Sequence, residues 1–578
     1  MPKTDLMFLE IIKNKLQTIV EEAGEVMRRT AMSGTIVEIM DCSSALWDEK
    51  KRLIGQASHI PIHIISMKPI VERVSQLFPP EALSPGDAII TNDPYLGMGQ
   101  HLADIAIVMP IFHKEKIVAF SSTMAHHQDI GGMAAGGMAS KATEIYQEGL
   151  RIPPLKFVKA NHINQDLLDM ILCNVRTPRE HFEGDLKAQL AGCHIIQNRF
   201  LELIEKYGVD TINLYIEELL DYSEQLAREQ IGKFPEGDYE YEDYLDNDGI
   251  TDNPIRIHLA LKIRDGSIVC DYTGTDPQAK GPVNCMIGAT EGMTLYTFCC
   301  LLDSNVPKND GCFRPVKVIV PKGCLLNPVE PAPVNNRNLT GHRIPDVVLG
   351  AFSKVVPDKV IAACYGSTSV YSFFVRDEMD PMRVYQVTNV APGGMGAGPF
   401  ADGESALCCH LSNTVAFEME STEIECPFLL VRKYGLLQDS GGPGKFRGGC
   451  GLEIHIEFLG NTCNLNLKGG RHTFAPYGLF GGESGGRGVY RIRRANGKIE
   501  LVPANSNNEI KRGDMLIYNS AGGGGYGDPW KRSAGRVLQD VIEGLVSFES
   551  AKSHYGVMID ETYEIVGALG QRKSHGNI

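Results

Sequence analysis

Apolar side chains near the start of the chain recur every three or four positions, the spacing of one face of an α-helix. They form a single stripe from Leu6 to Met27. Residues 88–91, 105–110 and 116–122 are instead short apolar runs bounded by Pro, Gly and Asn-Asp-Pro, which is typical of buried strands. Helical spacing returns over residues 185–234, with core positions predicted at Leu201, Leu203, Ile204, Leu214, Ile216, Leu219 and Leu220.

The later part of the chain has the pattern of strands and turns. Residues 255–263 and 268–272 alternate between apolar and polar and are joined through Arg-Asp-Gly-Ser, which predicts a hairpin. Residues 489–494 and 498–502 predict another around Ala-Asn-Gly. Glycine becomes dense from about residue 393 and includes four in a row at residues 522–525. Apolar positions between Ala534 and Leu545 predict a terminal amphipathic helix.

These patterns predict an α+β protein, with a helix-rich N-terminal region followed by β-rich, glycine-rich domains and a C-terminal helix. The turn cluster that starts at Pro235 suggests the first boundary. We predict four segments: an N-terminal α/β domain (1–234), a central α+β domain (235–391), a glycine-rich β domain (392–530) and a C-terminal helical tail (531–578).

Composition and charge narrow the function classes. The formal net charge is −15 and no block of Lys and Arg occurs, which argues against a nucleic acid partner or an anionic membrane. The first residues lack the pattern of a signal peptide, and no apolar run is long enough for a membrane span. The 15 cysteines include no C-x-x-C pair, so reduced thiols are expected. We predict a soluble, cytoplasmic protein.

Histidine and aspartate gather around two of the predicted strands. His101 and Asp104 stand at the start of one strand, and the adjacent His126 and His127 follow the next. If the two strands are neighbours, one edge of the sheet brings these groups together. Histidine nitrogens and carboxylate oxygens suit Zn²⁺, Mn²⁺ or Fe²⁺. Because side chains alternate along a strand, at most one of His126 and His127 can join the ligands, and the other can orient them.

Alternative interpretations of these histidines and of Asp41 remain open at this point. The histidines could be hydrogen-bonded loop residues with no metal. Asp41 could be a further ligand or a general base, or it could be a turn residue or a helix cap. Nucleotide binding is not supported, because Gly444-Lys445 is followed by Phe446 rather than by Ser or Thr.

Motifs along nearly the whole chain resemble the hydantoinase B/oxoprolinase family. They begin with Asp41–Asp48 and Ser58–His63, and continue through Pro85-Gly86-Asp87, Thr91–Tyr95, His101–Asp104, Ala125–Gly132, Gln147–Pro154, Asp310–Pro315, Asp439–Gly449, Gly522–Pro529 and Ala551–Val557. Two stretches depart from the family pattern, Gly97–Gln100 and Val334–Arg337, and both are expected near substrate.

The resemblance implies a metal site and a partner. His101, Asp104 and His126 match the family's metal ligands, and Asp41 matches an aspartate at or beside the metal. It implies one divalent metal, zinc with manganese as the alternative. It also implies a separate A-type subunit with an actin-like ATPase fold, which uses ATP and Mg²⁺, and a small third subunit in some complexes. ATP is then not bound by this chain.

The function expected on this basis is ring opening of a cyclic amide, such as a hydantoin, N-methylhydantoin, 5-oxoproline or a lactam, after phosphorylation by the A-type subunit. Asp41 would act as a catalytic base or ligand, and His127 would orient a ligand or the leaving group. The alternative is a subunit of an ATP-dependent carboxylase for acetone or acetophenone. A third hypothesis is a structural histidine cluster in a scaffold protein.

Overall fold

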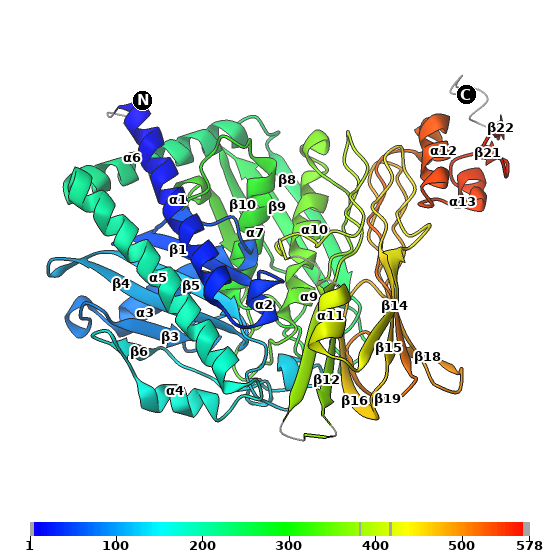
Figure 1. Ribbon diagram of the computed structural model, residues 1–578. Helices are drawn as coiled ribbons and strands as arrows, with labels where there is room; N and C mark the ends of the chain where they lie inside the picture. The colour runs from blue at the N-terminus through cyan, green and yellow to red at the C-terminus, as the bar shows by residue number, and fades with distance from the viewer. Residues whose placement is uncertain (1–4, 378, 381–382, 415–418, 570–578) are drawn as a thin grey trace. The chain divides into compact units, whose positions relative to one another are not determined.

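The structure is a computed structural model that describes residues 5–377, 379–380, 383–414 and 419–569 (Figure 1). The chain forms two units, each built from separate segments. Unit 1 comprises Met1–Glu240, Leu259–Arg337 and Asn413–Val415, and unit 2 comprises Tyr241–His258, Asn338–Ser412 and Ala416–Ile578. The four segments predicted from the sequence stay a prediction, and residues 570–578 of the last one lie outside the described residues.

Unit 1 is built on an antiparallel sheet of seven strands in the order β2-β1-β5-β4-β3-β6-β7. Its central strands are apolar along most of their length, because helices cover both faces of the sheet and leave few positions exposed to water. The strands are β1 (Cys42–Asp48), β2 (Leu53–Gln56), β3 (Ala88–Thr91), β4 (Asp104–His113), β5 (Lys116–His126), β6 (Leu155–Lys159) and β7 (His162–Ile163). The three strands predicted between residues 88 and 122 are confirmed as β3, β4 and β5, the last two being longer than predicted.

The pairing of β4 with β5 contains a bulge. Ile111 pairs with Ala119, whereas the next residue, Phe112, pairs with Ile117, which leaves Val118 as an extra residue on β5. Beyond the bulge the strands run in regular register until Asp104 pairs with His126.

Helices cover both faces of this sheet. The helices α1 (Leu6–Thr30) and α5 (Arg179–Tyr207) pack side by side across it (Figure 1), and α3 (Pro61–Leu77) contacts the same central strands. Ser122 contacts Met67 of α3, while its neighbour Thr123 contacts Gln189 of α5. Because consecutive strand residues face opposite ways, α3 and α5 lie on opposite faces.

The predicted helix over residues 185–234 is two helices. It breaks at Gly208, whose φ of 82° is unfavourable for residues with a side chain, and α6 (Val209–Ile231) follows. Leu214 was predicted in the core but is 50% exposed on α6, whereas Leu219 and Leu220 are buried.

A second sheet has the order β11-β10-β9-β8, from β8 (Gly237–Leu245), β9 (Ile255–Arg264), β10 (Ser267–Asp271) and β11 (Val316–Ile319). The predicted hairpin is confirmed as β9 and β10, and Asp265 and Gly266 turn the chain with positive φ. Helix α7 (Ile287–Leu301) packs closely on α3, because Gly288 and Gly292 leave room for Pro69 and Ile65.

Unit 2 contains two antiparallel sheets with a common apolar core. One has the order β13-β12-β16-β19, from β12 (Ser369–Arg376), β13 (Val384–Ala391), β16 (Thr462–Lys468) and β19 (Ser506–Lys511). The other has the order β14-β15-β20-β17-β18, from β14 (Leu429–Leu436), β15 (Leu452–Phe458), β17 (Val489–Arg493), β18 (Ile499–Val502) and β20 (Met515–Asn519). The predicted second hairpin is confirmed as β17 and β18.

Glycine-rich segments of unit 2 pack backbone against backbone. Gly523 donates its N–H to the carbonyl of Gly449 and accepts from Gly442, so these segments are tied together by main-chain hydrogen bonds. After them the chain forms α12 (Ala534–Ile542), α13 (Phe548–Ser553), β21 (Val557–Ile559) and β22 (Ile565–Ala568), which share a small core. The sequence predicted α12 but neither α13 nor the strand pair.

The remaining α-helices are α2 (Gly34–Val37), α4 (Gln165–Leu172), α8 (Asp310–Phe313), α9 (Arg337–Gly341), α10 (Arg343–Phe352) and α11 (Met419–Glu425). Within the described ranges, none of the helices combines the length and the hydrophobicity that crossing a membrane requires.

Candidate metal centre

Three strands of unit 1 bring the predicted site residues to one edge of the sheet. Asp104 begins β4, and its register partner His126 ends β5. Asp41 directly precedes β1, on the other side of β5, and its carbonyl accepts the backbone N–H of His126 at 3.0 Å. Because neighbouring strands are antiparallel, the start of β1, the end of β5 and the start of β4 coincide.

The side chains of His101, Asp104 and His126 converge. Asp104 Oδ1 lies 2.9 Å from Nε2 of His101 and 3.0 Å from Nδ1 of His126. The two imidazole rings stack, with centroids 5.1 Å apart. One donor atom from each of the three residues lies within 4.8 Å of the other two, which is the spacing of groups that can share one metal ion.

The chemistry of these groups fits a divalent metal. Both ring nitrogens of His101 are buried; Nε2 faces Asp104 at 2.9 Å, and Nδ1 has no hydrogen-bond partner among the described residues. Burial lowers the pKa of His101 to about 3, so the ring is neutral. Burial alone would raise the pKa of Asp104, but its neighbours, above all the charged guanidinium of Arg337, hold it well below its usual value. Neutral imidazoles and an ionised carboxylate are the protonation states that bind metals.

Two further side chains contact the group. His63, from the first turn of α3, places Nε2 3.5 Å from Asp41 and 3.6 Å from the second carboxylate oxygen of Asp104. Arg337 donates to that same oxygen and is itself buried. Asp104 therefore offers Oδ1 to the histidines, while Oδ2 is held by Arg337.

Asp41 lies at the accessible side of this arrangement. Its side chain is 22% exposed, whereas that of Asp104 is fully buried. It reaches the other residues through His63 and through its backbone contact with His126.

His127 points to the other face of the sheet. Its Nε2 lies 3.0 Å from the side-chain oxygen of Gln189 on α5. Its ring packs on the ring of Phe182, with the two ring centroids 4.4 Å apart. Burial lowers the pKa of His127. The structure therefore brings His101, Asp104 and His126 together, with Asp41 beside them, and places His127 against α5.

Reasoning from the sequence assigned no role to His63 or Arg337. His63 belongs to the Ser58–His63 motif, and the two histidines of this motif could have been identified from the sequence as candidate site residues. Arg337 ends the Val334–Arg337 stretch, which departs from the family pattern. Its contact with Asp104 joins residues 233 positions apart, and no local pattern predicts such a pairing.

A second group, Asp346, Cys364 and His410, has metal-like spacing in unit 2. Its surroundings are different. Burial raises the pKa of Asp346 to about 8 and that of Cys364 well above its usual value. The oxygens of Asp346 already have partners, because Oδ2 pairs with the buried guanidinium of Arg471 and Oδ1 accepts the backbone N–H of Cys364. We therefore assign the candidate centre to unit 1.

Comparisons with known proteins identify the family of this chain. The family model described as Hydantoinase B/oxoprolinase matches residues 5–529. The B-type subunit of a putative D-/L-hydantoinase from Pseudomonas sp. strain NS671 is 32% identical over 97% of both chains. The beta subunit of the caprolactamase from Pseudomonas jessenii is 31% identical over 100% of this chain and 99% of its own.

Two solved structures have the same fold. The ATP-dependent caprolactamase from Pseudomonas jessenii matches with a TM-score of 0.90 and 29% identity, over 100% of this chain and 99% of that one. An acetone carboxylase structure matches with a TM-score of 0.88 and 20% identity, over 96% of this chain and 80% of that one. At that identity, the second match is evidence for the fold alone.

Proposed function

The chain belongs to the hydantoinase B/oxoprolinase family, and on this premise we propose that it is the metal-dependent B-type subunit of an ATP-dependent cyclic-amide hydrolase. The substrate class is a hydantoin, N-methylhydantoin, 5-oxoproline or a lactam. Two relatives, one from a putative hydantoinase and one from a caprolactamase, are each matched over nearly their full length and support this assignment.

The observation that carries the proposal is the convergence of His101, Asp104 and His126 at the edge of the sheet. Two imidazoles and one carboxylate are a common zinc set, and manganese is the alternative. A divalent cation held by them would supply positive charge to a reacting carbonyl oxygen and would lower the pKa of bound water.

Four side chains near the proposed metal ligands have separate roles in the proposed reaction. Arg337 holds Oδ2 of Asp104, which fixes the direction of Oδ1. Asp41 is the most accessible carboxylate of the group, so it is the proposed acceptor for a proton from the attacking water. His63 lies between Asp41 and Asp104 and limits the movement of both. His127 supports the sheet from the α5 side.

The proposal includes a second polypeptide. Both of these relatives are named as single subunits of their enzymes, and this supports a complex of at least two chains. We propose an A-type subunit with an actin-like ATPase fold that phosphorylates the substrate, with a small third subunit in some complexes. ATP and Mg²⁺ would be used there, because this chain lacks a P-loop motif.

Metal analysis tests the site directly. We expect about one equivalent of zinc or manganese in the purified chain, and its loss in His101→Ala and Asp104→Ala. His113→Ala is a matched control, because His113 ends the same strand β4 at its far end. Folding of each variant is checked by circular dichroism. Wild-type protein that folds but binds no metal after reconstitution would contradict the proposal.

Activity is then measured with the A-type subunit, ATP and a panel of lactams and hydantoins. We expect an opened ring, detected by mass spectrometry, without added bicarbonate. A product that forms only from a ketone and bicarbonate would replace the hydrolase by a carboxylase. Activity per assembled complex that survives in His101→Ala would favour the scaffold.

A further inference from the structure

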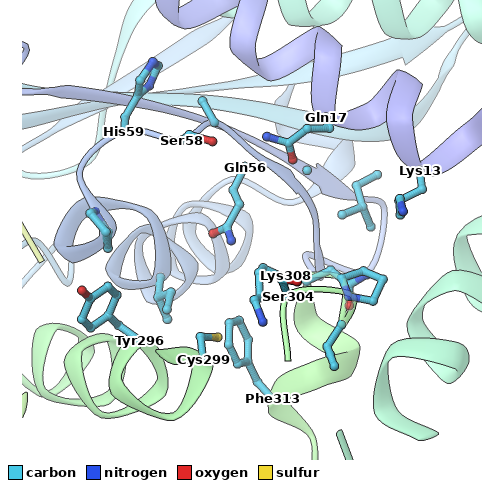
Figure 2. Close-up of a pocket in the computed structure, with 18 of the residues that line it drawn as sticks. Lys13, Gln17, Gln56, Ser58, His59, Tyr296, Cys299, Ser304, Lys308 and Phe313 are labelled. Carbon is cyan, nitrogen blue, oxygen red and sulfur yellow. The ribbon is translucent and has the colours of Figure 1, made fainter. Parts of the chain in front are cut away.

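Unit 1 contains a cavity of about 490 Å³ that shares no residue with the candidate metal centre. Four parts of unit 1 line it: α1, α7, the segment between β2 and α3, and the residues before α8. Figure 2 shows Gln56, Cys299 and Lys308 around the same space. The volume is in the range of pockets for small ligands.

The charge of the lining is opposite to that of the protein. Lys13 and Lys308 line the cavity, and its described lining includes no Asp or Glu, in a chain whose formal net charge is −15. Glu21, outside the lining, already accepts hydrogen bonds from the lining residues Gln17 and Ser58. Lys13 is already paired, with Nζ 2.5 Å from Glu10. The cavity therefore has an excess of positive charge that centres on Lys308.

The ammonium group of Lys308 lacks a partner among the residues that the structure describes. Its Nζ is buried and makes no hydrogen bond. A buried charge without a partner is unfavourable, because it has lost water and gained nothing in return. An anion in the cavity would supply the missing interaction.

The neighbouring thiols do not supply it. Cys299 and Cys300 both feel the charge of Lys308. A hydrogen bond to Cys312 and burial raise the pKa of Cys299, and burial raises that of Cys300 to about 11. Both thiols are therefore neutral near pH 7, and the negative charge has to come from a ligand.

The other residues that line the cavity indicate the chemical nature of the ligand. Ile54, Ile65, Tyr296 and Phe313 give apolar and aromatic surface. Gln56 adds an amide that can donate to an oxygen atom. Further polar residues of the lining include Asn14, Gln17, Ser58 and Asn309. Apolar and aromatic surface beside one unpaired cation and several amide donors suits a small organic molecule with one anionic end.

We propose that this cavity binds a small organic oxyanion, a carboxylate or a phosphate monoester with an apolar body, whose charged end pairs with Lys308. This site is additional to the proposed hydrolase centre, and its test does not depend on enzyme activity.

The test is isothermal titration calorimetry of the full chain with benzoate, phenyl phosphate and inorganic phosphate. We expect benzoate or phenyl phosphate to bind, and the stronger of the two identifies the oxyanion. Inorganic phosphate should bind more weakly because it lacks the apolar body. Lys308→Met should weaken binding at least about tenfold, since it removes a charge-assisted hydrogen bond. Lys308→Arg should retain binding.

Two further variants keep the test decisive. Lys233→Met removes an exposed lysine elsewhere in unit 1 and should bind like wild type. Ser304→Trp fills the cavity from an exposed position and leaves Lys308 in place, so it should lose binding while the protein stays folded. The proposal is overturned if neither organic anion binds, or if folded Lys308→Met or Ser304→Trp binds as tightly as wild type.

Discussion

Asp104 contacts four side chains of the candidate centre, and its surroundings make its charge essential for stability. Oδ1 faces His101 and His126, while Oδ2 faces His63 and Arg337. Arg337 is 4% exposed, so the guanidinium depends on this carboxylate for its compensation.

Replacing Asp104 by Asn should therefore destabilise the metal-free protein. We expect a loss of about 3 kcal/mol in the free energy of unfolding, since Arg337 stays buried without a counter-charge. Adding Arg337→Met should recover most of the loss but no metal binding. The measurement is urea unfolding in chelator with elemental analysis. If the double variant is no more stable than Asp104→Asn, the buried charge is not the cause.

Glu148 predicts a pH dependence. Burial raises its pKa from 4.5 to about 8, although the backbone N–H of Asn335 donates a hydrogen bond to one of its oxygens. The folded chain keeps this proton between those pH values while the unfolded chain releases it. Stability therefore falls as pH rises from 4.5 to 8, by at most about 1.4 kcal/mol per pH unit.

Glu148→Gln removes this contribution. We expect the difference in Tm between pH 6 and pH 8 to be smaller in the variant than in wild type. Glu115→Gln, in the exposed turn between β4 and β5, is the control and should behave like wild type. An unchanged pH difference in Glu148→Gln would show that Glu148 is ionised in the folded protein.

The sequence predicted the residues of the site that belong to β4 and β5, but not the ones that reach it from elsewhere. His101, Asp104 and His126 flank two neighbouring apolar strands, so local pattern and strand pairing bring them together. His63 and Arg337 come from a helix end and a distant loop. Only the packing of those segments on the sheet makes them neighbours.

At the scale of elements, the glycine-rich segments of unit 2 contain positions that have no room for a side chain. A Cβ on Gly523 would lie 1.9 Å from the carbonyl oxygen of Met395, and a backbone atom cannot move aside as a side chain can. We expect Gly523→Ala to cost about 3 kcal/mol or more.

A second glycine provides the contrast. Gly535 lies in α12, and no atom of the described residues lies within 4 Å of its Cβ position. Gly535→Ala should stabilise the protein by up to about 1 kcal/mol. Thermal unfolding of both variants, followed by the fluorescence of Trp530, checks the pair. Equal effects of the two substitutions would contradict close backbone packing around Gly523.

Elements with a strong periodic pattern were predictable, and breaks and ends were not. The stripe that starts at Leu6 forms α1 as a single helix, because its apolar positions meet one continuous core. The break at Gly208 depends on a backbone angle that the apolar pattern does not encode. The pair β21–β22 is too short for its alternation to differ from chance.

At the scale of the whole molecule, the order of segments predicts how the chain unfolds. Both units are discontinuous, and Tyr241–His258 of unit 2 is flanked on both sides by segments of unit 1. Loss of unit 1 therefore releases both ends of a segment that unit 2 needs. We expect both units to unfold in one transition.

The two tryptophans of the chain test this, since Trp47 lies in unit 1 and Trp530 in unit 2. Leu16 is fully buried in the core of unit 1, and Leu16→Ala should cost about 2–5 kcal/mol. In Trp530→Phe and Trp47→Phe backgrounds, we expect the urea midpoint to shift equally. A shift seen only with Trp47 would mean that the units unfold independently. Lys15→Ala, on the exposed side of α1, is the control.

The bulge at Val118 decides which of two adjacent histidines shares a face with Asp104. If Val118 were paired like its neighbours, the register counted from the β4–β5 turn would pair Asp104 with Ala125, and His127 would replace His126 on that face. Deleting Val118 would leave every pair beyond it in place, whereas deleting a residue between the bulge and His126 would bring His127 opposite Asp104. Which of the two histidines is the candidate ligand thus depends on whether the number of residues between the β4–β5 turn and the histidines of β5 is odd or even. Evolution can exchange the two histidines by a change in length far from the site, without altering any residue of the centre itself.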